Sequence, residues 1–288
     1  MLDVFNQVDW LLPLCLLLFG LVVGSFFNVV IYRLPLMMES RWRRDCCELL
    51  EQTPEKAGAP LTLATPNSHC PHCGTGIKPW HNIPVISYLL LRGKCAACGV
   101  GISVRYPLVE LATGLLTLSL VTAFPVSTAL LGAIAFTWAL IVLTMLDVDH
   151  KLLPDNITLP LMWLGLVFNI GGTYVSLEDA VLGAMLGYLL LWSVYWLFKL
   201  VTGKEGMGYG DFKLLAALGA WLGWQALPLI ILLSSLVGAI CGIALMFAKG
   251  RGREVPIPFG PYLAAAGWLS LMWGDEISRR YLSAAGLN

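Results

Sequence analysis

Two pairs of cysteines have the types and spacing of a metal site. Cys70 and Cys73 form one CxxC pair, Cys95 and Cys98 form the other, and the 21 residues 74–94 separate the pairs. Two such tight turns can complete a tetrahedral Zn²⁺ shell, a pattern typical of four-thiolate zinc knuckles. We predict a structural zinc site, because four thiolates leave no position open for water.

Other roles for the cysteines stay open at this point. The pairs could form disulfides or redox-active dithiols, although a reducing cytoplasm keeps thiols free and no thioredoxin-like βαβ pattern surrounds them. His69 and His72 lie beside the first pair as alternative ligands. Of the other four cysteines, two lie in apolar segments as small apolar residues and an adjacent pair has no evident partner: Cys15 and Cys241, then Cys46 and Cys47.

Aspartates near the ends of apolar segments are the second group that could do chemistry. Asp147, Asp149 and Asp155 lie in MLDVDHKLLPDN, and Asp211 lies in GMGYGDFKL. Ionisable side chains at membrane depth are costly and usually functional. These two segments are therefore candidates for an active site.

Each aspartate also has a structural interpretation. Asp211 and Asp155 both stand at positions for a helix N-cap, where the helix dipole favours an anion. Asp147 fits less well, because the C-terminal end of a helix is the wrong end of the dipole for a carboxylate. A surface ion pair of Asp147 with His150 or Lys151 would stabilise the fold only slightly.

The functional interpretation pairs Asp147 with Asp211, since both are expected at the same membrane boundary on separate helices. Two carboxylates within a few ångström cannot both ionise easily, so one holds a proton and they titrate as a pair. The ionised member can then take a proton from water while the protonated member polarises a carbonyl. Gly208 and Gly210 would allow the backbone to approach closely beside Asp211.

The composition excludes an ordinary soluble domain and a general nucleic-acid binder. The 288 residues are 58% hydrophobic and 12% charged, against roughly 45–50% apolar and about 25% charged in soluble proteins. The 18 basic residues balance 18 acidic ones, which leaves no surplus for phosphate binding. Continuous apolar runs, without the alternation of barrel strands, predict an all-α membrane protein.

Eight apolar segments approach the roughly 20 residues that a helix needs to span a bilayer. The sixth is the least secure, because it is short and contains glycine. The flank of the first carries Asp3 and Asp9 but no Lys or Arg, so we expect a retained helix and not a cleaved signal peptide. The segments cover residues 10–31, 106–124, 127–146, 157–170, 180–200, 212–224, 226–248 and 259–273.

The basic residues predict the orientation, since cytoplasmic loops retain Lys and Arg. With eight spans, 16 of the 18 basic residues fall on one side, and only Arg279 and Arg280 fall on the other. Removing the sixth span would move Lys249, Arg251 and Arg253 to the outside, so the charges favour counting it.

The long polar stretch between the first two spans is expected in the cytoplasm. Residues 37–66 are mixed in charge, and MMESRWRRDCCELLEQ is expected to form a short amphipathic helix at the membrane surface. We predict three parts: a first span at 1–33, a cytoplasmic loop domain with the zinc site at 34–105, and a membrane-embedded core at 106–288.

Seven motifs follow one another along nearly the whole chain: GSFFNVVIYRLP, SHCPHC, NIPVISYLLLRGKCAAC, ISVRYPLVE, LDVDHKLLPDNITLP, GYGDFK and PFGPYLA. In these motifs the chain resembles the type IV prepilin peptidases. Members of that family are GxGD-class aspartyl proteases of the bacterial inner membrane that also N-methylate their product.

The resemblance implies roles for individual residues. Asp147 matches the family's first catalytic aspartate, and Asp211 matches the aspartate of the GxGD motif. Asp149 lies close enough to modulate the pair, while Asp155 and Lys213 belong to the same motifs with expected orienting or structural roles. The four paired cysteines match the zinc loop of the bifunctional branch.

The resemblance also implies substrates and a second cofactor. The expected substrates are type IV prepilins and type II secretion pseudopilins, whose basic leader is cut after a glycine at the cytoplasmic membrane boundary. S-adenosylmethionine would then methylate the new N-terminal amine. No GxGxxG follows a predicted strand, so the methyl-donor residues stay unknown. We expect a multi-pass inner-membrane protein whose zinc loop and active site face the cytoplasm.

Two other functions have to be distinguished from this one. A non-catalytic membrane assembly factor or transporter could contain eight helices and a zinc knuckle, but that function would not explain Asp211 within GYGD. A single-function archaeal-type preflagellin peptidase would share the two aspartates while lacking the paired CxxC loop and the methyl donor.

Overall fold

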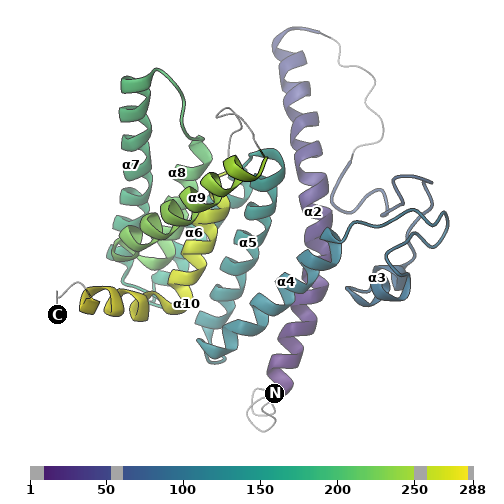
Figure 1. The fold of residues 1–288 in the computed structure, drawn as a ribbon, viewed down its shortest axis with the longest axis horizontal. Coiled ribbons are helices and arrows are strands. Elements are labelled where there is room, and N and C mark those ends of the chain that lie inside the picture. The colour runs from purple at the N-terminus through teal and green to yellow at the C-terminus, as the bar shows by residue number, and fades with distance from the viewer. Residues whose placement is uncertain (1–9, 53–60, 250–257, 285–288) are drawn as a thin grey trace. The chain divides into compact units, whose positions relative to one another are not determined.

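The protein is all-α, as the apolar runs predict (Figure 1). The computed structural model describes residues 10–52, 61–249 and 258–284, and within these ranges there is no strand, only two isolated β-bridges. Asp3, Asp9, Arg251 and Arg253, which enter the predicted orientation, lie outside the described residues. The main helices are α2 (Leu11–Leu49), α4 (Arg105–Ser119), α5 (Thr128–His150), α6 (Asp155–Asn169), α7 (Leu177–Thr202), α8 (Tyr209–Leu222), α9 (Leu227–Lys249) and α10 (Gly260–Ala284).

Each of the eight predicted apolar segments overlaps one of these helices, although the bounds differ: the segment 106–124 runs past the end of α4 and the segment 212–224 past the end of α8. By length and composition, four described segments are long and apolar enough to cross a membrane: Leu11–Leu49, Thr128–His150, Leu177–Thr202 and Trp224–Ala244. Helices α4, α6 and α8 have only 14 or 15 residues, about 21–23 Å at 1.5 Å per residue. The chain is therefore a membrane protein by its apolar helices, and the count of eight spans stays a prediction.

The chain divides by packing into two compact units, Met1–Val121 and Thr122–Asn288. In the first unit, α2 and α4 form an antiparallel pair in close backbone contact. A Cβ on Gly20 would lie 2.9 Å from Gly114 Cα, and a Cβ on Gly24 would lie 2.8 Å from Glu110 Cα. Small residues let membrane helices approach this closely. The predicted division at residues 33 and 105 is untested and stays a prediction.

Helix α2 is longer than the predicted first span. It runs unbroken for 39 residues through Pro35, about 58 Å at 1.5 Å per residue, or nearly twice the thickness of a hydrocarbon core. The sequence MMESRWRRDCCELLEQ, expected to form a short helix, is helical as far as Leu49 but is the continuation of this long helix. The helix continues past the membrane boundary because the one N–H donor that Pro35 lacks does not end it.

The second unit is built around α8. Ten of its 14 residues are buried, from Asp211 to Trp221. Helix α7 packs on one side with its backbone almost touching, since a Cβ on Gly187 would lie 2.6 Å from the Leu215 carbonyl oxygen. On the other side, the Trp221 indole donates to the Leu161 carbonyl of α6 at 2.7 Å. The least secure apolar segment of the sequence is thus the centre of this core.

Helix α10 changes direction where the last predicted span ends. Trp273 has non-helical backbone angles (φ −139°, ψ 17°), which divide the helix into two straight parts. The first part carries the small residues of GPYLAAAG, and the second carries charged side chains that form local ion pairs, including Glu276 with Arg280 at 2.6 Å. The start of α10 approaches the aspartates described next.

Candidate functional site

The second unit brings Asp147 and Asp211 together from different helices. Asp147 lies in the last turn of α5 and Asp211 in the first turn of α8, and their side chains are 5% and 7% exposed. The two carboxylates are near enough for their charges to interact. Asp147 is not a member of a surface ion pair, because it is buried and the Lys151 amine approaches backbone carbonyl oxygens, at 3.0 Å from Val148.

Asp147 is held by a third helix that the sequence did not connect to it. The backbone N–H of Gly260, at the start of α10, donates to Asp147 Oδ2 at 3.0 Å. A Cβ at Gly260 would lie only 2.7 Å from the same oxygen. Glycine is therefore required for this approach, and PFGPYLA supplies a backbone donor to the first aspartate.

Asp211 does not cap its helix in the predicted manner. The N-cap is Gly208, and Asp211 stands three residues later with its carboxylate folded back on the Gly208 backbone. An acid at this third position is placed as in the reciprocal half of a capping box. The helix dipole favours a negative charge in the first turn, so this position suits both a cap and an ionised carboxylate.

The two glycines of GYGD have different surroundings. A Cβ on Gly210 would lie 2.7 Å from Leu153 Cβ, so the space beside it is filled by the chain between α5 and α6. A Cβ on Gly208 would meet only Asp211 Oδ2, at 3.8 Å. The open space beside Asp211 is therefore at Gly208, while Gly210 serves packing.

Asp149 and Asp155 are exposed, and Lys213 is half-buried. Asp149 is two residues beyond Asp147 and faces outward. Asp155 is the first residue of α6 but makes no capping bond. Its two oxygens instead accept from Lys213 Nζ at 2.7 and 2.8 Å, which ties the start of α6 to the start of α8. The expectation of a simple cap at Asp155 was wrong, because this ion pair takes the carboxylate.

The first unit contains the zinc site that the cysteine spacing predicts. The sulfur atoms of all four paired cysteines lie within 4.8 Å of one another, and Cys70 Sγ is 3.9 Å from Cys98 Sγ. A tetrahedral Zn²⁺ with bonds of about 2.3 Å would separate its sulfurs by about 3.8 Å. Four thiolates at this spacing fit a structural zinc ion, and neither His69 nor His72 belongs to the group.

The two zinc knuckles repeat the same backbone geometry. The amide of Cys70 donates to the Thr75 carbonyl, and the amide of Cys95 donates to the Val100 carbonyl. Each CxxC is followed by a glycine with positive φ, 70° at Gly74 and 71° at Gly99. Hydrogen bonding with the side chain and backbone of Thr75 lowers the pKa of the Cys73 thiol to about 6. A thiol of that pKa is largely thiolate at neutral pH, which is the form that binds metal.

Family models match both parts of the chain. The bacterial peptidase A24 N-terminal domain matches residues 18–124, which include the four zinc cysteines. The type IV leader peptidase family matches residues 134–243, which include both aspartates. Proteins named prepilin leader peptidase/N-methyltransferase are 58% identical in Stutzerimonas stutzeri, over 95% of each chain, and 54% identical in Aeromonas hydrophila, over 98% of each chain. The chain belongs to the type IV leader peptidase family.

Similarity of this extent confirms the resemblance that the motifs indicated. The Pseudomonas aeruginosa protein of the same name is 57% identical over 95% of this chain and 94% of its own. No solved structure matches the chain significantly. The leader peptidase match ends at residue 243, before Gly260, so the backbone donor to Asp147 is a contact that only the three-dimensional arrangement makes visible.

Proposed function

We propose that this chain is a bifunctional enzyme of the bacterial inner membrane. It cleaves the basic leader of type IV prepilins and type II secretion pseudopilins after a glycine, and then methylates the new N-terminal amine. The proposal is carried by one observation: two buried aspartates from α5 and α8 interact in a chain 58% identical to a protein of that name.

Asp147 and Asp211 would share the hydrolytic step. The ionised member of the pair takes a proton from water, and the other donates its proton to the scissile carbonyl oxygen as the water attacks. Gly260 N–H holds Asp147 Oδ2 in place, which leaves the other oxygen to face the water. An extended substrate would lie along the open side of Gly208.

The proposed orientation places both sites in the cytoplasm. Lys and Arg gather in the segments between α2 and α4 and at the ends of α5, α7 and α9, as the positive-inside rule predicts for cytoplasmic loops. Cytoplasmic thiols stay reduced, which agrees with four unpaired cysteines at zinc-binding distance. Cys70, Cys73, Cys95 and Cys98 would hold the zinc ion, which orders the loop and takes no part in hydrolysis.

S-adenosylmethionine would supply an electrophilic methyl group to the amine that cleavage exposes. The residues that bind it stay unassigned, since neither unit carries a dinucleotide-type glycine loop. Cleavage has to come first, because the amine is part of a peptide bond until then. The two activities can therefore be separated by supplying a substrate without its leader.

The experiment that tests the proposal compares three aspartates in the full-length chain in bilayer vesicles. Asp147→Asn and Asp211→Asn should each abolish leader cleavage, because an amide keeps the shape of the side chain but cannot ionise. Asp149→Asn is the matched control: it lies on the same helix two residues away, it is exposed, and it should retain substantial cleavage. Full cleavage by either of the first two variants would refute the pair.

A second arm uses a substrate whose leader has already been removed. The Asp147→Asn and Asp211→Asn chains should still methylate it, which shows that they are folded in the membrane. If Asp149→Asn lost as much cleavage as Asp147→Asn, the partner of Asp211 would be wrongly chosen. If wild-type chain neither cleaved nor methylated, the alternative of a non-catalytic assembly factor or transporter would replace the enzyme.

A further inference from the structure

The zinc loop carries an apolar surface that neither the cleavage site nor the zinc ion uses. It comprises the 3-10 helix η1 (Pro79–Asn82) and the short helix α3 (Ile86–Leu90). Leu89 and Leu90 are 68% and 78% exposed. Three further members are also exposed: Trp80, Ile83 and Ile86. We call these five residues the loop apolar face.

We propose that the loop apolar face inserts into the lipid bilayer, so that the zinc loop is a membrane-anchored lobe and not a free cytoplasmic domain. The first reason is depth. Val85, just before α3, donates its N–H to Glu110 Oε2 of α4 at 2.8 Å. Glu110 packs at Gly24, where a Cβ would lie 2.8 Å from its Cα.

Gly24 lies well inside the first apolar span. Ile31, the last residue of that span, lies seven positions further along, which corresponds to about 10 Å along a helix. Arg33, just beyond the end of the first apolar span, holds residues 62–66. From there the chain folds back along α2, so that Val85 lies beside the apolar part of that helix. In Figure 1, α3 lies level with the N-terminal half of α2, below the start of α4.

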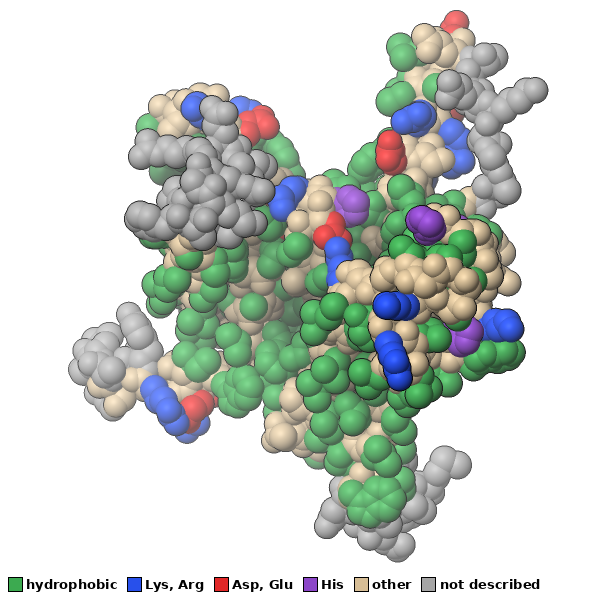
Figure 2. Space-filling model, turned by 45° about the vertical axis from the view of Figure 1, so that its right-hand side comes forward, with side chains coloured by type: hydrophobic (Ala, Val, Ile, Leu, Met, Phe, Trp, Pro, Cys, Tyr) green, Lys and Arg blue, Asp and Glu red, His purple; other side chains and the backbone are tan. Residues whose placement is uncertain are grey.

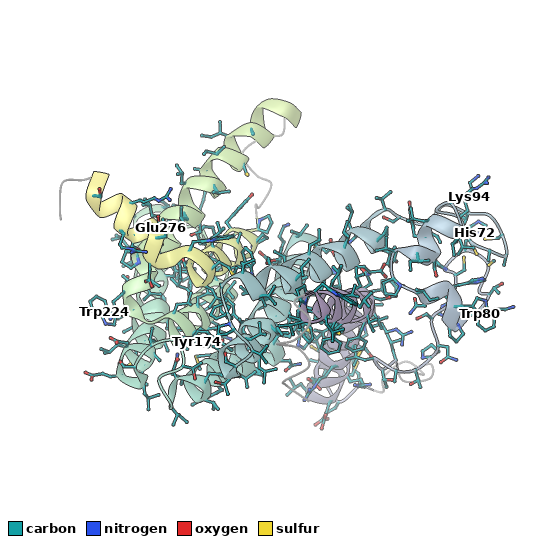
Figure 3. The ribbon with its side chains drawn as sticks, turned by 90° about the horizontal axis from the view of Figure 1, so that it is seen from below. His72, Trp80, Lys94, Tyr174, Trp224 and Glu276 are labelled. Carbon is teal, nitrogen blue, oxygen red and sulfur yellow. The ribbon has the colours of Figure 1, made fainter. Side chains whose placement is uncertain are left out.

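The second reason is charge. No Asp or Glu occurs from Leu61 to Val109, while Lys78, Arg92 and Lys94 flank the apolar residues. Figure 2 shows basic and hydrophobic side chains without acidic ones over the bulge that this loop forms, and Figure 3 shows Trp80 and Lys94 at its outer edge. The Lys78 amine lies 5.4 Å from the centre of the Trp80 ring. Tryptophan beside basic residues is typical of a membrane interface with anionic headgroups.

The third reason is that this segment satisfies its own backbone. Leu89 and Leu91 donate to the carbonyls of Val85 and Ser87, at 3.1 and 2.9 Å. The Ser87 hydroxyl is buried and donates to the Trp80 carbonyl at 2.7 Å. Polar backbone groups at lipid depth have to be bonded within the protein, and the groups named here are. A short helical segment with an apolar outer face fits insertion to about 5–10 Å at the boundary between headgroups and acyl chains.

The tether at Glu110 explains an unusual backbone conformation. Val85 has a positive φ of 59°, which is rare for a β-branched residue. The turn that results points its N–H toward Glu110 and sends α3 away from the α2–α4 pair. A strained backbone conformation persists only where the surrounding structure stabilises it. Here the buried Glu110 carboxylate stabilises the conformation of Val85 by accepting its N–H.

The test places an environment-sensitive fluorescent amino acid at position 90 in the full-length, zinc-loaded chain, reconstituted in vesicles with spin-labelled quencher lipids. The matched control carries it at position 72, which is exposed on the same loop but lies within the first zinc knuckle, between Cys70 and Cys73. We expect quenching several-fold stronger at 90 than at 72. Equal zinc content in both chains shows that each label leaves the loop folded. Equal quenching at the two positions would overturn the proposal.

Lipid charge provides a second readout. Quenching at 90 should increase when anionic lipid replaces zwitterionic lipid, and Lys78→Gln with Lys94→Gln should remove that increase. An increase that survives in the double variant would overturn the role of the basic flank. The choice of leaflet rests on the orientation proposed above, whereas lipid contact is read without any cleavage assay, so the two proposals can fail separately.

Discussion

The two units position their candidate functional side chains differently, one by helix packing and the other by metal binding. In the second unit, Asp147 and Asp211 are fixed by helices, and α8 is buried along most of its length. In the first unit, only Cys70 and Ser87 are buried among residues 61–105, so this loop has almost no apolar core. A segment of this kind needs a metal or other cross-link in place of a core. Packing therefore positions the carboxylates, and the metal positions the loop.

Removing zinc should break the first unit and spare the second. Cys70→Ser with Cys95→Ser takes one ligand from each knuckle, and structural zinc contributes on the order of 10 kcal/mol to folding. We expect complete loss of bound zinc and rapid proteolysis within residues 61–105, while prepilin cleavage persists. Metal analysis and limited proteolysis measure these effects.

The control for zinc removal is Cys46→Ser with Cys47→Ser, which deletes the same number of thiols from the far end of α2. It should leave the metal content unchanged. If the Cys70→Ser, Cys95→Ser variant kept its zinc, the prediction of a four-thiolate site would be wrong. If leader cleavage were lost together with the zinc, the two units would not fold independently of each other.

A single methyl group should disturb the second unit at the point where three helices meet. The Cβ of Gly260→Ala would come within 2.7 Å of Asp147 Oδ2, so the N–H donor and the carboxylate have to move apart. Displacement of a catalytic group by about 1 Å can lower the rate on the order of 100-fold. We expect that loss in kcat for leader cleavage, with zinc content unchanged.

Gly274→Ala is the matched control for Gly260, because it adds the same methyl group to the same helix where the nearest atom is 3.8 Å away. It should cleave at the wild-type rate. A wild-type rate in Gly260→Ala would mean that the backbone donor does not position Asp147.

Arg33 holds the start of the loop in the first unit, as Gly260 holds Asp147 in the second. It is buried, and its guanidinium donates to the carbonyls of Thr62, Leu63 and Pro66, which anchors the start of the loop on α2. Arg33→Met removes the donor to three carbonyls of half-buried or exposed residues. Water can replace part of that donor, so the cost stays below the about 1–3 kcal/mol of a fully buried unsatisfied group. We expect faster proteolysis near residues 61–66 while the rate of leader cleavage stays close to wild type. Arg43→Met, on the exposed part of the same helix, should change neither.

The sequence predicted most of what depends on short-range pattern. Residue types and spacing were enough for the zinc site, since both CxxC turns are local and only their meeting had to be inferred. The positions of the helices followed from apolar runs, and Asp147 and Asp211 were paired because two helix ends were expected at one boundary. These predictions needed no knowledge of how helices pack.

Contacts between distant segments could not be predicted in this way. The Gly260 donor lies 113 residues from Asp147, and a backbone N–H has no signature in residue type. The length of α2 was missed because helix continuation past a membrane boundary is decided by hydrogen bonding and not by polarity. The cap expected at Asp155 was wrong because Lys213, 58 residues away, takes its carboxylate.

This last ion pair should have the smallest effect. Lys213 and Asp155 side chains are 30% and 52% exposed, so solvent screens their attraction, and exposed pairs contribute about 0–1 kcal/mol. Lys213→Gln should therefore lower leader cleavage no more than a few-fold, and Asp155→Asn should do the same. In the double variant the two losses should not add, because each single variant already breaks the only interaction that they share. Loss of cleavage in Lys213→Gln as complete as in Asp211→Asn would instead place this amine in the chemistry, since two residues on one helix turn would then act on the same reacting atoms.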